Sequence, residues 1–242
     1  MTRRRWIADE VSGDHAALLG DNARHLAKVL RARVGQEFEV SAEGRVRLGR
    51  IVSVAEQRVE FELGEQLLAG KVRSVLLLLA IFKFDRMEWA IEKATELGVE
   101  RIGFVVADRS DKHLVAATGK RLARWKRIAT EAAQQARRTS PPSVSGPIPF
   151  TELVRMEMPG ARIVLAESER GISLMEVLEG SSAPGVALAI GPEGGWTDRE
   201  LSQFKVSSWI AASLGPTILR AETAAVAALA VTMASLHGRD PA

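Results

Sequence analysis

The chain of 242 residues contains no cysteine. Without thiols it can form neither disulfide bonds nor zinc–thiolate or iron–sulfur centres, and it cannot use a cysteine nucleophile. Four histidines are present, but they are scattered and lack the spacing that metal ligands usually show. We therefore expect no metal centre, and the absence of cysteine fits the reducing environment of the cytoplasm.

Long apolar stretches are also missing. No run of 18 or more apolar residues suggests a membrane span. The first ten residues include basic side chains, but the apolar segment of a signal peptide does not follow them. These absences predict a cytoplasmic protein without a membrane partner.

A chain of this length can bury roughly 75% of its unfolded surface, so it needs no disulfide or metal cross-links for stability.

The formal net charge is only +3, but the charge is unevenly distributed. Between residues 112 and 138, eight Lys or Arg residues stand against a single acidic residue, Glu131. A charge run is most often the solvated face of a helix, but a concentrated basic segment also suits a polyanion such as nucleic acid. The charge alone leaves both interpretations open.

Residues 1–70 show the pattern of a small β-rich domain. Three segments alternate apolar and polar residues, as strands with one buried face do. These segments are 37–41, 45–54 and 58–63, with turns at 42–44 and 55–57. A helix is expected at 21–33, with Leu26, Val29 and Leu30 on its apolar face. The sequence predicts a small β-barrel with one helix, a form that RNA-binding modules often use.

Residues 71–242 alternate between strand and helix patterns, which is typical of an α/β domain with a mostly parallel sheet. The strand segments are continuously apolar, as expected for strands buried on both faces. They are predicted at 75–82, 101–106, 162–166, 185–190 and 209–214. Helices are predicted at 85–98 with Asp85 as the cap, at 118–138, after the Thr197–Glu200 capping box, and at 222–236.

Two Gly-Pro turns near the C-terminus are the strongest functional signal. Residues 189–200 read AIGPEGGWTDRE and residues 214–225 read LGPTILRAETAA, and each turn leads from a strand into a helix. Ligands of open α/β sheets bind beyond the carboxyl ends of the strands, where both turns fall. Gly191, Gly194 and Gly195 lack a Cβ and let a ligand approach the backbone. Three glycines in five residues favour a binding site over an ordinary connection.

The first turn also narrows the kind of ligand. It has neither the Gly-Lys-Ser/Thr ending of a P-loop nor the G-x-G-x-x-G pattern of a dinucleotide site. It carries Glu193 instead, whose carboxylate would repel a pyrophosphate. S-adenosylmethionine (SAM) fits better, because it combines adenosine with positively charged sulfonium and ammonium groups and has no phosphate.

The two motifs, Ile190-Gly-Pro-Glu-Gly-Gly195 and Leu214-Gly-Pro-x-Ile-Leu-Arg-Ala-Glu-Thr-Ala224, resemble those of the RsmE family of SPOUT methyltransferases. That family methylates N3 of a uridine in the decoding region of 16S ribosomal RNA. The resemblance covers the whole chain and includes His25 to Arg31 and Trp125 to Ala129. It implies a PUA-like RNA-binding barrel at 1–70 and a SPOUT domain with a deep trefoil knot at 71–242. It also implies a homodimer that uses SAM and acts on the small ribosomal subunit.

The resemblance also implies roles for particular residues. Arg220 is expected to stabilise the charge that develops on the uridine, with an ion pair to Glu193 or Glu222 as the structural alternative. Glu222 is a candidate base or an orienting partner of Arg220, and hydroxide or water could equally take the proton. Arg31, Arg137 and Arg138 are expected to contact RNA. Cofactor contacts are expected from Leu165, Ile190, Gly191, Glu193, Gly195, Leu214, Gly215, Ile218 and Leu219.

Three positions depart from the family pattern. Thr217 and Ser140 stand where the family often has a basic residue, and Arg137 replaces a glycine. These departures bear on RNA docking more than on the reaction type. One alternative is a SPOUT enzyme that modifies a ribose 2′-oxygen or a tRNA base. Another is a ribosome-associated RNA-binding protein without catalysis, and a nucleotide-binding regulator is weakened by the missing P-loop.

Overall fold

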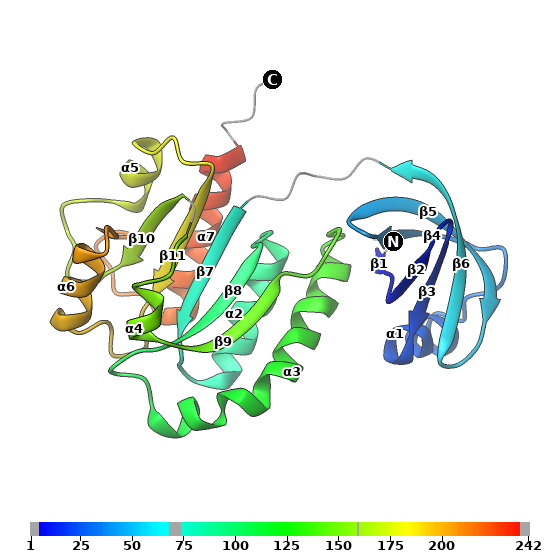
Figure 1. Ribbon diagram of the computed structural model, residues 1–242, viewed down its shortest axis with the longest axis horizontal. Helices are drawn as coiled ribbons and strands as arrows, with labels where there is room; N and C mark the ends of the chain where they lie inside the picture. Colours follow the sequence, from blue (N-terminus) through cyan, green and yellow to red (C-terminus); the bar gives the residue numbers. More distant parts are fainter. Residues whose placement is uncertain (1–4, 68–73, 159, 238–242) are drawn as a thin grey trace. The chain divides into compact units, whose positions relative to one another are not determined.

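The computed structural model describes residues 5–67, 74–158 and 160–237. These residues form two compact units. The first unit holds the described residues of 1–71 together with 130–141, and the second holds those of 72–129 and 142–242. Figure 1 follows both units along the chain.

The first unit is built on a curled, mixed sheet of six strands that forms a half-barrel (Figure 1). The strand order is β1-β4-β5-β6-β3-β2, and only β1 and β4 pair in parallel. The three predicted strands are confirmed as β4, β5 and β6, whereas β1 to β3 were not predicted because they are short. The bounds are β1 Trp6–Ile7, β2 Glu10–Ser12, β3 His15–Leu19, β4 Glu37–Ala42, β5 Arg45–Val54 and β6 Arg58–Leu67.

The helix expected at 21–33 is shorter and less regular than predicted. Helix α1 spans Gly20–Arg24 and continues into a single π-helical turn, η1, at His25–Val29. Leu26 is buried, but Val29 and Leu30 are 65% and 50% exposed, so their assignment to the apolar face is wrong. The prediction used the α-helical period, which a π-helical turn does not keep. Arg31, with φ at 50°, follows the end of the helix.

The second unit contains a six-stranded sheet that is parallel throughout, which confirms the prediction of a mostly parallel α/β domain. Its order is β12-β10-β11-β7-β8-β9. Edge strand β9 was not predicted because it contains two prolines, which are tolerated at sheet edges. The bounds are β7 Ser74–Ala80, β8 Arg101–Val106, β9 Ser143–Pro149, β10 Ala161–Leu165, β11 Gly185–Ile190 and β12 Ile210–Ala212.

Helices pack on both faces of this sheet (Figure 1). One apolar cluster joins Leu77 and Leu79 of β7 to residues of α2, α3, α5 and α7. The other joins Leu76 and Leu78 to residues of α4 and α6. The helices are α2 Phe84–Glu96, α3 Lys112–Gln135, α4 Phe150–Leu153, α5 Leu174–Glu179, α6 Asp198–Val206 and α7 Ala221–His237.

Two predicted helix starts need correction. Helix α2 has Lys83 at its N-cap, and Asp85 lies in the first turn, where its charge suits the positive end of the helix. Helix α3 begins at Lys112 instead of 118, because the Asp111 carboxylate accepts hydrogen bonds from the backbone N–H groups of His113 and Leu114. The capping box of Thr197 and Glu200 at the start of α6 is confirmed.

Gly160 lies at a close approach between neighbouring chain segments. Its φ is +103°, and a Cβ there would lie 2.0 Å from the Gly185 carbonyl oxygen. We predict that Gly160→Ala lowers the free energy of unfolding by about 3 kcal/mol, from backbone strain and overpacking. Gly119→Ala is the control, because this helical glycine has open space around it and alanine favours helix by about 1 kcal/mol. Equal urea midpoints for the two variants would contradict the prediction.

Candidate functional site

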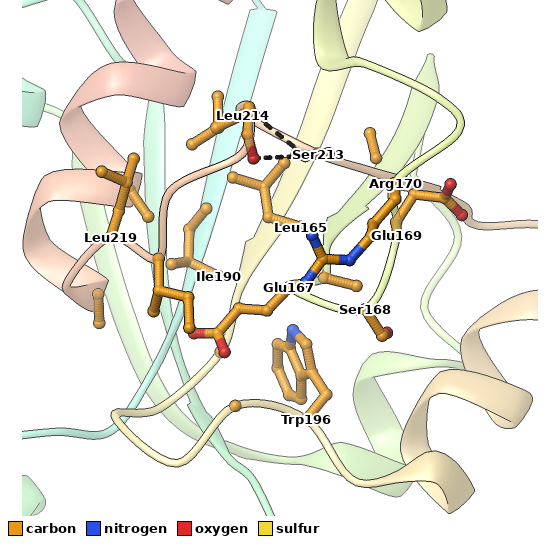
Figure 2. A pocket seen from close by; sticks show the side chains of 18 of the residues that line it. Leu165, Glu167, Ser168, Glu169, Arg170, Ile190, Trp196, Ser213, Leu214 and Leu219 are labelled. Carbon is orange, nitrogen blue, oxygen red and sulfur yellow. Dashed lines mark hydrogen bonds between the residues drawn. The ribbon is translucent and has the colours of Figure 1, made fainter.

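A cavity of about 820 Å³ lies at the carboxyl ends of β10, β11 and β12 (Figure 2). This volume is within the range of about 300–1,000 Å³ that small-molecule sites occupy. Because the three strands are neighbours in a parallel sheet, the loops that follow them meet at one edge. The wall comprises residues 165–173 after β10, 190–196 after β11 and 212–221 between β12 and α7.

The cavity brings together residues that are far apart in the sequence. Arg220 lines it, and so do all nine residues for which cofactor contacts were predicted. Figure 2 shows Leu165, Ile190, Leu214 and Leu219 around the same space. The nine are Leu165, Ile190, Gly191, Glu193, Gly195, Leu214, Gly215, Ile218 and Leu219. These nine residues combine apolar side chains, exposed backbone and one carboxylate, that of Glu193.

A tryptophan and an arginine, which also line the cavity, hold the glycine-rich loop at 191–195. A Cβ at Gly191 would lie 3.2 Å from the Trp196 indole nitrogen, so the backbone lies directly on that ring. Trp196 also packs edge-on against Phe204, with ring centroids 5.0 Å apart. The Arg109 guanidinium donates to the Gly194 carbonyl oxygen at 2.6 Å and more weakly to that of Trp196 at 3.4 Å.

A buried carboxylate ties the helix that follows this loop to the end of β8. Glu200 is fully buried, and one of its oxygens accepts from the Asp108 backbone N–H at 2.8 Å. Its other oxygen accepts from the Thr197 backbone N–H at 2.8 Å and from the Thr197 hydroxyl at 3.0 Å. The Arg199 guanidinium beside Asp108 holds the pKa of that carboxyl below its usual value. These bonds fix the start of α6, which directly follows the cavity loop at 190–196.

The sequence did not reveal the role of Arg86 at this site. Its Nη1 donates to Glu193 Oε1 at 2.6 Å, and its Nε lies 3.7 Å from Glu222 Oε1. In the structure the ion pairs with these two glutamates are made by Arg86. Arg220 is exposed at the cavity, and its side chain makes no ion pair or hydrogen bond with any described residue. The one feature of the sequence that could have drawn attention to Arg86 is its position in the first turn of α2. A cation there opposes the helix dipole, so it needs a partner outside the helix.

Glu222 lies beside the cavity and is absent from the described residues that line it. It is only 8% exposed, and its Oε2 has no hydrogen-bond partner among the described residues. Its Oε1 lies 3.7 Å from Arg86 Nε, so the two side chains form an ion pair.

The three arginines predicted to contact RNA all lie in the first unit. Arg31 is exposed. The Arg137 guanidinium pairs with the Glu39 carboxylate, and the Arg137 carbonyl oxygen accepts from Arg5. Burial lowers the pKa of the Arg138 guanidinium to about 10. Arg31 and Arg137 are both exposed, whereas Arg138 is only partly exposed.

Helix α3 carries further exposed basic residues in the part that belongs to the second unit. The Arg121 guanidinium lies 5.2 Å from the centre of the Phe84 ring, and Arg124 pairs with Glu88 through two nitrogens. The exposed basic residues are Lys112, Lys120, Arg121, Arg124, Lys126 and Arg127.

The described residues lack membrane-spanning helices and clustered metal ligands. None of their helices has both the length and the apolar character needed to cross a membrane. They also contain no group of three or more His, Asp or Glu side chains arranged to hold a metal ion.

Family profiles assign the chain to a class of enzyme. A profile described as an RNA methyltransferase domain matches residues 70–233, and one described as an RNA methyltransferase PUA domain matches residues 18–64. The fold and the cavity therefore belong to an RNA methyltransferase with a PUA domain.

Whole-chain relatives identify the family. The ribosomal RNA small subunit methyltransferase E of Mycobacterium tuberculosis is 34% identical over 227 residues, which are 90% of this chain and 86% of the relative. The enzyme of the same name from Bacillus subtilis is 30% identical and covers 88% of this chain and 87% of its own length. The chain belongs to the ribosomal RNA small subunit methyltransferase E family, RsmE.

Solved structures agree with this assignment. The ribosomal RNA small subunit methyltransferase E of Neisseria gonorrhoeae, bound to SAM, matches with a TM-score of 0.84 at 28% identity. The match covers 96% of this chain and 97% of that one. A Legionella pneumophila protein with bound SAM matches with a TM-score of 0.81 at 27% identity, covering 97% of each chain.

The buried capping box of α6 can be tested against its exposed counterpart in α5. We predict that Glu200→Ala lowers the free energy of unfolding by about 2–3 kcal/mol, because the backbone N–H groups of Asp108 and Thr197 lose a buried acceptor. Glu176→Ala removes the same motif at Ser173, where water can replace the lost bonds, and should cost less. Denaturant titration of both variants gives the comparison. An equal loss for the two variants would show that the burial of Glu200 does not add to the stability that its capping box provides.

Proposed function

We propose that this chain transfers the methyl group of SAM to N3 of a uridine in the decoding region of 16S ribosomal RNA, within the small ribosomal subunit. The observation that carries the proposal is the cavity formed by the ends of β10, β11 and β12, in a chain of the RsmE family. The Neisseria gonorrhoeae relative, which binds SAM, supports the choice of cofactor.

The residues of the cavity fit the chemistry of SAM. A Cβ at Gly195 or Gly215 would meet nothing within 4 Å, so the backbone there is open to a ligand. Apolar side chains such as Leu165 and Leu219 suit an adenine ring, and the Glu193 carboxylate has the charge that would suit the positive groups of SAM. When bound, SAM supplies a methyl group carried on a positive sulfonium.

The remaining catalytic work is to prepare the uridine. Its N3 carries a proton and becomes a good nucleophile only when that proton leaves. Arg220 lines the cavity, and its guanidinium has no partner among the described residues, so it could stabilise negative charge on O2 or O4 of the base. Holding N3 in line with the methyl group lowers the barrier further, by about 7–11 kcal/mol in the best cases.

The proton acceptor is proposed to be water or hydroxide. Glu222 was the side-chain candidate, but it contacts Arg86 and lies outside the lining of the cavity. A carboxylate is also a weak base for this proton unless its pKa is strongly raised. An orienting role for Glu222 agrees better with its surroundings.

Helix α7 supports a homodimer. Its sequence, AETAAVAALAVTMASLH, is apolar on every side, and helices of that kind are normally buried all round. Within the chain α7 contacts α2, α5 and the strands β7 and β11. One face remains partly or fully exposed, at Val226, Ala227, Ala230, Val231 and Ala234. We propose that a second copy of the chain covers this face.

The family also guides the finer architecture. We propose a PUA domain at 1–70 that reads RNA shape and a SPOUT domain at 71–242 whose three cavity loops form a trefoil knot. RNA contacts are proposed from Arg31, Arg137 and Arg138, and from the exposed basic residues of α3. Small ribosomal subunits, the proposed substrate, place the reaction in the cytoplasm.

The role of Arg220 gives the main test of this function. We predict that Arg220→Ala lowers kcat by about 10²–10³, as the loss of one oxyanion donor does in other enzymes. The assay is transfer of labelled methyl groups to small subunits that lack the modification. SAM binding by calorimetry and the melting temperature should stay near the wild-type values. A loss of less than tenfold in a folded variant would exclude this role for Arg220.

The electrostatic part of RNA binding predicts a dependence on salt. If about five phosphates are contacted, log K should fall against log salt with a slope of about −4. Lys120→Gln, at an exposed position of α3, should reduce the magnitude of the slope by about one. Filter binding at several salt concentrations gives both slopes. A flat dependence for the wild type would exclude phosphate contacts as the basis of binding.

A further inference from the structure

Arg86 occupies a helix position that disfavours a positive charge. It lies in the first turn of α2, whose unpaired N–H groups and dipole favour acidic side chains over cations. Asp85, its neighbour, has the sign that this position favours. The energy that offsets the unfavourable place of Arg86 must therefore come from groups outside α2.

Those groups are two carboxylates, one in the cavity wall and one beside it. Arg86 Nη1 lies 2.6 Å from Glu193 Oε1 in the glycine-rich loop, and Arg86 Nε lies 3.7 Å from Glu222 Oε1 in the first turn of α7. The side chains of Arg86, Glu193 and Glu222 are 28%, 40% and 11% exposed. One guanidinium thus joins the loop after β11 to the helix that follows the loop after β12.

Removal of this cation would leave two carboxylates close together without compensation. Glu222 would suffer most, because it is nearly buried and its second oxygen already lacks a hydrogen-bond partner among the described residues. An unpaired buried charge is strongly unfavourable, so the two segments would move apart or take up water. Movement of the segments would displace Glu193 and also Arg220, which lies two residues before Glu222.

We propose that Arg86 is a positioning residue for SAM binding. It holds the glycine-rich loop and the start of α7 at the separation that SAM requires, through its bridge between Glu193 and Glu222. This role rests on the proposed function, since it concerns the same cavity. The bridge supplies no reacting atom and acts only through the two segments that it joins.

The test measures SAM affinity by calorimetry in Arg86→Met, Glu193→Gln and the double variant. Arg86→Met should weaken SAM binding by about tenfold, and the double variant should bind no more weakly than the weaker single variant, because both changes break the same bridge. Arg86→Lys should fall between wild type and Arg86→Met, since an ammonium keeps the charge but cannot form the planar two-sided contact.

Arg58→Met is the matched control. Arg58 also bridges two carboxylates, of Glu10 at 2.8 Å and Glu60 at 2.7 Å, but it lies in the first unit and does not line the cavity. Its SAM affinity should equal that of the wild type. Melting temperatures of all variants separate a loss of the bridge from a general loss of fold.

The outcomes distinguish this proposal from the one on which it rests. Wild-type affinity in Arg86→Met, or effects of Arg86→Met and Glu193→Gln that simply add, would overturn the role of Arg86 while leaving the methyltransferase intact. If Arg86→Met does not fold, Arg86→Lys decides, and an affinity equal to the wild type would overturn the bridge. Failure of the wild type itself to bind SAM would instead overturn the proposed function.

Discussion

Parallel pairing of β10 with both β11 and β12 sets the position of every residue in the cavity wall. Neighbouring parallel strands end at the same edge of a sheet, so the three loops that follow them must share one space. Two of these loops contain a Gly-Pro step, and glycine leaves backbone groups accessible there. The cavity is thus a consequence of strand order, and its chemistry comes from the few side chains that reach it.

Side chains from outside the loops then hold the cavity wall in place. Arg109 bonds the glycine-rich loop from the end of β8, and Arg86 contacts it from α2. Glu200 joins the beginning of α6 to Asp108. The first two contacts use a charged guanidinium, and the third uses a buried carboxylate. Arg220 differs, because its guanidinium has no partner among the described residues and is available to a substrate.

Local patterns predicted much of the fold and the centre of the site. Strand β11 matches its predicted bounds, and the glycine-rich loop was recognised because its signal lies within five consecutive residues. Arg86 and Arg109 escaped prediction, since their partners are about 107 and 85 residues away along the chain and only the folded structure brings them together. The helix at 21–33 was mispredicted because the π-helical turn at His25–Val29 breaks the period on which apolar patterns depend.

The product of the reaction tests the central claim most directly. Small ribosomal subunits that lack the modification would be incubated with the protein and labelled SAM, and their nucleosides would be identified by mass spectrometry. We predict that the label appears in 3-methyluridine and in no other nucleoside. A different methylated nucleoside, or no transfer despite measurable SAM binding, would contradict the proposed methylation of uridine N3.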